Sequence, residues 1–155
     1  MLDLAEERAR AVLGRRETRS LGVVRAEAAA EFARAAGETA RHLVDPRHPG
    51  FVVHPMYVVS LLRAEPGPDA GELRPDGMYR DEVPGTDGLG VRLMAGGQEV
   101  RWTGQVRVGD HIEVSRSLTA VERKSAGFLL LTVDKSYAAA GRGLLVEVSE
   151  RFIVR

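Results

Sequence analysis

The sequence has 155 residues, of which 44% are hydrophobic and 28% are charged, and this composition is typical of one folded globular domain. Its 22 basic and 22 acidic side chains cancel, and it contains no basic block, so we expect no nucleic-acid partner. It contains no cysteine, which excludes disulfides, thiolate catalysis and cysteine-based zinc sites and is typical of the reducing cytoplasm.

The first third of the chain predicts two helices and a short strand. Residues 2–13 place apolar side chains on one side of a helix, at Leu2, Ala5, Ala9 and Val12. The charged residues between them leave no room for the apolar core of a signal peptide. Residues 21–24 indicate a short strand. Residues 26–36 have high helix propensity, and Gly37 is a natural helix stop.

An apolar run predicts the central helix of the domain. Residues 54–64 read HPMYVVSLLRA, and Pro55 suits a first helical turn because its missing N–H needs no partner there. The apolar side chains point nearly all round, so we expect a long buried helix from Pro55 to Arg63. This run, like every other in the chain, is far shorter than the ~20 residues of a membrane span. We therefore expect a cytoplasmic protein with no membrane partner.

Residues 65–90 form a Gly/Pro-rich segment between the helical part and the rest of the chain. They hold four of the seven prolines and six of the seventeen glycines. Both residue types disfavour helices and strands, and the segment is too long for an ordinary connection. We expect a loop that is either functional or locally disordered.

Alternating apolar and polar residues after Gly90 predict an antiparallel sheet. The apolar positions form three series: Ile112, Val114, Leu118 and Ala120; Leu129, Leu131, Val133 and Tyr137; and Leu144, Val146, Val148, Phe152 and Val154. Turns are expected at residues 107–110, 124–127 and 139–143. Such strands with one buried helix imply a single α+β domain over residues 1–155, its sheet wrapped around the helix. The uncovered sheet edges predict a dimer.

Three stretches of this sequence resemble the MaoC-like dehydratase family in its N-terminal, FAS1-like form. Residues 96–155, with RVGD at 107–110, resemble the family's strand half. The stretch FARAAGETARHLVDP falls where the family carries its Gly-Asp-x-Asn-Pro-x-His-x-Asp-Pro motif, and VVHPMYVVSLL falls where its central helix begins. The resemblance runs from about residue 13 to residue 155. It implies a hot-dog fold, in which an antiparallel sheet wraps a central helix.

The same resemblance implies an activity and the residues that perform it. The family hydrates enoyl thioesters and dehydrates 3-hydroxyacyl thioesters with (R) specificity, on coenzyme A or acyl carrier protein, in fatty acid or polyketide metabolism. Its catalytic aspartate corresponds to Glu38, which is one methylene longer. Its catalytic histidine corresponds to Leu43, and the nearest imidazole, His42, is one residue early. The resemblance therefore makes Glu38 and His42 catalytic candidates, and Leu43 a substrate contact.

The start of the central helix supplies the other candidates. Active hydratases of the family read His-Gly-Met there, and this chain reads His54, Pro55 and Met56. The resemblance implies that His54 lies close to the thioester, and that Pro55, Met56 and Tyr57 contact the substrate. Proline has no N–H, so residue 55 cannot donate to the thioester carbonyl.

Each candidate also has a purely structural interpretation. Glu38 can be a solvated loop carboxylate, and His42 a surface histidine. His48 reads as an exposed loop residue, whereas His54 can cap the central helix. The spacing of these histidines matches no known ligand pattern, so we expect neither a metal nor a cofactor. The single Trp102 is expected in the core or at an interface.

Three functions remain open from the sequence. The first is an active dehydratase or hydratase with a rebuilt acid/base pair. The second is a non-catalytic subunit that binds acyl chains or completes a heterodimer with a catalytic partner. The third is another thioester reaction on the same fold, hydrolysis or isomerisation, with Glu38 alone. All three predict an acyl thioester ligand and a homodimer or a heterodimer with another hot-dog subunit.

Overall fold

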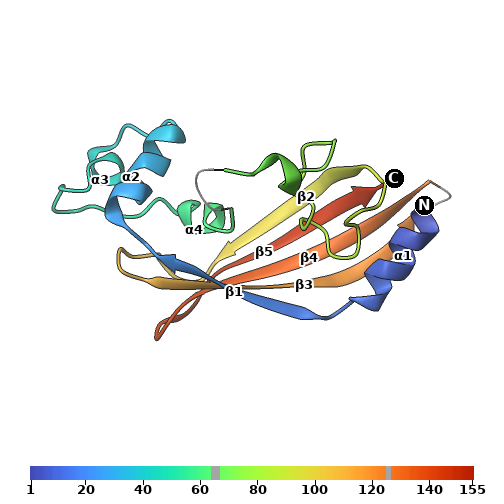
Figure 1. Ribbon diagram of the computed structural model, residues 1–155. Helices are drawn as coiled ribbons and strands as arrows, with labels where there is room; N and C mark the ends of the chain where they lie inside the picture. Colours follow the sequence, from blue (N-terminus) through green and yellow to red (C-terminus); the bar gives the residue numbers. More distant parts are fainter. Residues whose placement is uncertain (64–66, 125–126) are drawn as a thin grey trace.

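The computed structural model describes residues 1–63, 67–124 and 127–155 and is built on one antiparallel sheet (Figure 1). The sheet has five strands in the order β1-β3-β4-β5-β2. Their bounds are β1 Arg16–Val23, β2 Leu93–Trp102, β3 His111–Lys124, β4 Phe128–Ala139 and β5 Gly143–Val154. The helices are α1 Leu2–Ala11, α2 Ala26–Ala35, α3 Arg41–Val44 and α4 Tyr57–Ser60. This is the α+β architecture with the antiparallel sheet that the sequence predicts.

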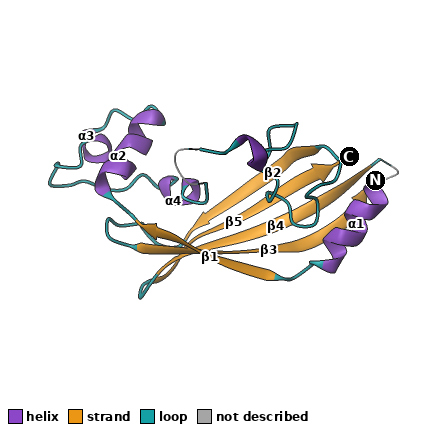
Figure 2. Ribbon diagram, viewed as in Figure 1, coloured by secondary structure: helices purple, strands orange, loops and turns teal. Residues whose placement is uncertain are grey.

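One face of the sheet, the inner face, is covered by helices and by the long connection to β2 (Figure 2). At one end α1 packs its buried Ala5 and Ala9 on the sheet. At the other end α2 and α4 cover the sheet with Ala29, Tyr57 and Val58. In the described part of the chain, no helix has the length and apolarity that a membrane span requires.

The predicted alternation in β3, β4 and β5 is confirmed, apart from two positions where a bulge intervenes. The register of β3 against β4 shifts between Leu118 and Ala120, so Val121 is buried in place of Ala120. The register of β4 against β5 shifts near the start of β5, so Leu145 is buried and Leu144 is exposed. An extra residue in one strand reverses the side-chain direction beyond it. Residues 125 and 126 of the predicted 124–127 turn lie outside the described residues.

The predicted long central helix from Pro55 to Arg63 is wrong in length. The helix α4 is a single turn, and residues 61–63 continue as turns. Its two adjacent valines lose side-chain freedom in a helix, which weakens the helix locally. Arg63 leaves the helical path and donates a hydrogen bond of 2.8 Å to Asp81 in the following segment.

The first strand is longer than the sequence predicts. Residues 21–24 carry its only apolar signal, but β1 spans eight residues, Arg16–Val23, and pairs with β3 from Arg16 to Val23. It is an edge strand whose residues are almost all exposed. Alternation reports burial on one face, so a strand with neither face buried shows none.

The Gly/Pro-rich segment is packed on the inner face over the part that the structure describes. Residues 65 and 66 lie outside that part. Residues 67–90 contain a short turn of 3-10 helix at Ala70–Glu72 and otherwise no helix or strand. Val83 is buried against the sheet core. The buried Arg74 donates hydrogen bonds to three backbone carbonyls, at Thr86 and Leu89 in its own segment and at Val91 directly after it.

Candidate functional site

Glu38 and His54, the two candidates that lie farthest apart in the sequence, meet in the structure. The Nε2 atom of His54 lies 3.5 Å from Oε1 of Glu38. The histidine side chain is 18% exposed and the carboxylate 38% exposed, so the pair is sheltered but open to a ligand. A carboxylate in contact with an imidazole is an arrangement that transfers protons between a substrate and the protein.

The end of α2 fixes the position of Glu38. Gly37 adopts a positive φ of 87°, which reverses the chain directly after the helix. The N–H of Glu38 then donates to the carbonyl of Ala33 at 3.0 Å, and the N–H of Gly37 donates to the carbonyl of Arg34 at 3.0 Å. These two bonds form a Schellman motif, which holds Glu38, the third residue after Ala35, in a defined place.

His54 is fixed by contacts on two sides. The backbone N–H of Met56 donates to its Nδ1 atom at 3.2 Å, so His54 stabilises the turn that precedes α4, whereas α4 itself has no side-chain cap among the described residues. The ring of Phe32, on α2, packs against the imidazole with ring centroids 5.4 Å apart. The structural and the functional interpretations of His54 are therefore compatible.

The other two histidines near the predicted motif lie apart from this pair. His42 is exposed on α3, and within the described residues its side chain makes neither a hydrogen bond nor an ion pair. Its carbonyl accepts the N–H of Val52, which ties α3 to the segment before α4. His48 accepts the N–H of Gly50 at 3.1 Å and so stabilises its own loop.

An apolar groove of about 590 Å³ lies beside the segment that carries His54. Its lining includes Val53 and Pro55, which flank His54 in the chain, and Leu43 on α3. Trp102, at the end of β2, is 47% exposed and also lines the groove. Of the predicted substrate contacts, Leu43 and Pro55 therefore line this groove. Met56 and Tyr57 do not, and Tyr57 is buried in the adjacent core.

The loop after Trp102 completes the groove and is held by a buried carboxylate. Asp110 accepts the N–H of Arg107 at 2.8 Å and a hydrogen bond from the Arg142 guanidinium at 2.7 Å. Arg142 also donates to the carbonyl of Gln105 at 2.9 Å. The predicted turns at 107–110 and 139–143 are thus joined to each other, and this contact sets the wall of the groove.

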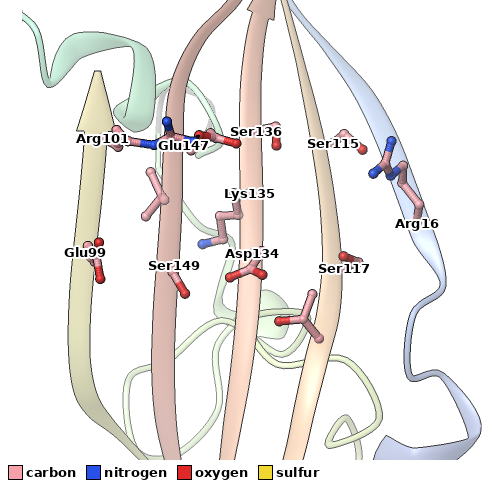
Figure 3. A pocket seen from close by; sticks show the side chains of 12 residues that line it. Arg16, Glu99, Arg101, Ser115, Ser117, Asp134, Lys135, Ser136, Glu147 and Ser149 are labelled. Carbon is pink, nitrogen blue, oxygen red and sulfur yellow. Dashed lines mark hydrogen bonds and ion pairs between the residues drawn. The ribbon is translucent and has the colours of Figure 1, made fainter. Parts of the chain in front are cut away.

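A second hollow, of about 410 Å³, lies on the outer face of the sheet (Figure 3). Its floor is a row of short hydroxyl side chains, including Ser115 and Ser136, and its rim carries charged groups. Arg101 and Glu147 at this rim already pair with each other. None of the described residues that line this hollow is a histidine or an aromatic residue.

The described residues contain no cluster of three or more histidine, cysteine, aspartate or glutamate side chains that could hold a metal ion. The residues that sequence reasoning missed at the site are Phe32 and the wall formed by Gln105 and Val106. Phe32 stands in the apolar stripe of α2, where a core residue and a residue that contacts a catalytic side chain have the same signature. No local pattern marks the groove wall.

Comparison with known proteins agrees with this architecture. The structure resembles a MaoC-like dehydratase from Phytophthora capsici, with a TM-score of 0.68 and 14% identity. The match covers 96% of this chain and 48% of that one, so this chain spans about half the length of that protein. It resembles the ChsH1-ChsH2 complex of Mycobacterium tuberculosis (TM-score 0.64, 17% identity, 98% of this chain and 89% of that one). It also resembles the (R)-hydratase from A. caviae (TM-score 0.59, 20% identity, 90% and 94%).

These likenesses confirm the hot-dog fold. No curated protein matches the sequence significantly. The family described as FAS1-like, dehydratase domain region, matches residues 11–146, which is most of the chain. The chain belongs to this family of FAS1-like dehydratase domains, whose fold is shared with the MaoC-like dehydratases.

Proposed function

We propose that this protein adds water to enoyl thioesters, or removes water from 3-hydroxyacyl thioesters, with Glu38 and His54 as its acid/base pair. The contact of 3.5 Å between His54 Nε2 and Glu38 Oε1 carries this proposal. Family membership supports dehydratase chemistry. The (R) specificity and the carrier, coenzyme A or acyl carrier protein, are part of the proposal.

The reaction requires two proton transfers, and the pair has two groups. In hydration a proton leaves water, the water oxygen bonds to the β carbon of the enoyl group, and the α carbon takes up a proton. One member of the pair accepts the first proton and the other donates the second. The two side chains lie 3.5 Å apart, and a small approach on substrate binding brings them within hydrogen-bond reach, so that the accepted proton passes between them and restores the pair after each turnover.

The apolar groove is the proposed site of the acyl chain. It is lined by Leu43, Val53 and Pro55 next to His54, and its lining is mostly apolar, as small-molecule pockets usually are. Pro55 cannot donate an N–H to the thioester carbonyl. A different backbone N–H or a partner subunit must therefore supply that contact in this protein.

The direct test is water addition to a short trans-2-enoyl thioester of coenzyme A, followed by loss of the absorbance of the conjugated double bond. Glu38→Gln and His54→Ala should each lower kcat by roughly 10²–10⁴-fold. His42→Ala is the matched control, because His42 is a histidine of the same region that lies exposed on α3. Equal rates for all three variants and the unaltered chain would contradict the proposal. Release of free thiol would instead indicate hydrolysis.

A second candidate is a non-catalytic subunit of a heterodimer, and a specific observation favours it. The family's catalytic histidine is replaced by Leu43, whose side chain cannot transfer a proton. One of the similar structures, ChsH1-ChsH2, is a complex of two proteins. This candidate predicts that the chain is inert alone and that activity appears on mixing with a hot-dog subunit whose Asp and His motif is intact. In that mixture Glu38→Gln should then have no effect.

A further inference from the structure

The hydrogen bonding around His54 determines which ring nitrogen carries the proton. The backbone N–H of Met56 points at Nδ1 from 3.2 Å. A nitrogen that accepts an N–H bond has a free lone pair, so in the neutral ring the hydrogen is on the other nitrogen, Nε2. Nε2 is the atom that faces Oε1 of Glu38 at 3.5 Å. The ring nitrogen that carries the hydrogen is therefore the one next to the carboxylate.

Phe32 holds the imidazole in this orientation. Its ring lies against the ring of His54 with centroids 5.4 Å apart and planes inclined by 56°. The Phe32 ring also contacts the Tyr57 ring edge-on, with centroids 5.7 Å apart and planes inclined by 64°. Tyr57 is buried in the core. Because Phe32 is itself held by a buried ring, it restricts the rotation of the His54 side chain.

The same helix carries both the carboxylate and the ring that holds the imidazole. Phe32 lies within α2, and Glu38 follows its C-terminal turn at Gly37, which two backbone hydrogen bonds fix. A displacement of α2 therefore moves Phe32 and Glu38 together. Because Phe32 also packs against His54, α2 contacts one member of the pair and positions the other.

We infer that Phe32 is a positioning residue. Together with the Met56 N–H, it keeps the His54 imidazole in the Nε2–H form. Glu38 is then the base of the pair, and His54 is the proton donor. This assignment rests on the proposed hydration. Glu38 takes a proton from water while the water oxygen bonds to the β carbon. The α carbon of the resulting enolate takes the Nε2 proton of His54, which leaves the ring as an imidazolate whose Nδ1 still accepts the Met56 N–H. The proton on Glu38 then passes to Nε2, and the pair returns to its starting state.

The first experiment is nitrogen NMR of the protein labelled with ¹⁵N-histidine at neutral pH, in which the two tautomers of imidazole give different ring-nitrogen shifts. His54 is assigned by the signals that disappear in His54→Ala. The unaltered chain should show His54 as the Nε2–H form, and Phe32→Tyr, which keeps the ring, should preserve it. Phe32→Leu should give a mixture of tautomers. A predominant Nδ1–H form in the unaltered chain, or an unchanged spectrum in Phe32→Leu, would overturn the inference.

The second experiment is steady-state hydration of the enoyl thioester. Phe32→Leu should lower kcat by roughly 10²-fold with little change in KM, because a misplaced catalytic group slows the chemistry more than binding. Phe51→Leu is the matched control: it removes a phenyl ring from the same hydrophobic cluster, and Phe51 makes no ring contact with His54 among the described residues. It should keep both kcat and the tautomer. If the unaltered chain shows no turnover, the proposed function fails, and the NMR result still decides the role of Phe32.

Discussion

Arg116 on β3 and Lys135 on β4 lie directly opposite each other on the inner face of the sheet, and each residue is only 4% exposed. Two neighbouring buried cations are stable only with carboxylates around them. Lys135 donates to Glu82 at 3.2 Å and to Glu150 at 2.5 Å, and Arg116 donates to Glu17 at 2.9 Å. We call these five residues, with Arg63 and Asp81, the inner ionic cluster.

The inner ionic cluster divides the core into two parts. On β4 it separates Val133, in the hydrophobic cluster under α1, from Tyr137, in the cluster under α2 and α4. It also joins the sheet to the segment before β2, because Glu82 of that segment pairs with Lys135. The central helix of this hot-dog fold is only one turn long. These ion pairs therefore hold the other covering segment, the one before β2, on the sheet.

Lys135→Met should therefore be strongly destabilising. The change removes the buried cation from Glu150 and leaves Glu82 with Arg63 alone, and breaking a buried ion pair costs about 3–5 kcal/mol. Urea unfolding should show this loss, and the double variant Lys135→Met, Glu150→Gln should recover part of it. Lys124→Met is the control, because Lys124 is 46% exposed and its ion pair lies at the surface. A similar small effect for Lys124 and Lys135 would contradict the role of the cluster.

The cluster should also make stability depend on acid. Burial alone would raise the pKa of Asp81. The opposing effects outweigh burial and lower the pKa below its ordinary value of 3.8: the hydrogen bond and charge of Arg63, the charge of Arg116 and the hydrogen bond from Arg19. A carboxyl whose pKa is lower in the folded state stabilises the fold above its unfolded pKa, and this contribution disappears as the pH falls through the folded pKa. The free energy of unfolding should therefore decrease below about pH 4.

The variant Asp81→Asn isolates this effect. Its unfolding free energy should be lower than that of the unaltered chain at neutral pH and should change less as the pH falls below about 4. Asp87→Asn is the control, because the Asp87 side chain is 67% exposed and its nearest cation, Arg80, is 3.8 Å away. Parallel pH curves for the unaltered chain and Asp81→Asn would show that Asp81 is not the group responsible.

Much of the sheet could be predicted from the sequence because its strands bury one face only. Positions such as Val114, Val133 and Phe152 alternate with polar residues and lie in the core. In each of the three strands a charged residue takes the place of an apolar one at an inward position, at Arg116, Lys135 and Glu150. These three charged residues at inward-facing positions are the sequence signal of the inner ionic cluster. Only the pairing register between the strands shows that their side chains lie close together.

The candidate site was harder to predict because it depends on long-range contacts. Glu38 and His54 could each be selected from the resemblance, but no spacing rule places them 3.5 Å apart. His42 is closer in sequence to Glu38 and is exposed on α3 instead. Helix α4 was predicted too long because apolar content indicates burial as well as helix, and a buried turn has the same composition.

Arg74→Met should loosen the segment before β2 without unfolding the sheet. Arg74 is the donor for carbonyls at Thr86, Leu89 and Val91, and unsatisfied buried acceptors cost about 1–3 kcal/mol. A local loss of this size raises the open population of the segment by roughly 10- to 100-fold. Limited proteolysis should then cut within residues 67–92 faster, while circular dichroism retains the strand signal. Arg92→Met, an exposed arginine of the same segment, should be cut at the original rate.

The last prediction concerns association through the β2 side of the molecule. Strand β2 is an edge of the sheet, so one side of its backbone has no partner strand among the described residues, and long free edges favour pairing with another chain. Trp102 at the end of this strand is 47% exposed beside the apolar groove, and exposed apolar surface of this kind marks interaction sites.

We expect light scattering to give twice the mass of one chain, or to do so once another hot-dog subunit is added. Trp102→Glu should give the mass of one chain with unchanged circular dichroism. Leu13→Glu is the control, because Leu13 is 42% exposed at the other end of the sheet, near Leu118. Since Trp102 is the single tryptophan, its fluorescence should also shift to the red as the unaltered dimer is diluted. A unit mass at all concentrations, with and without a second subunit, would exclude this interface.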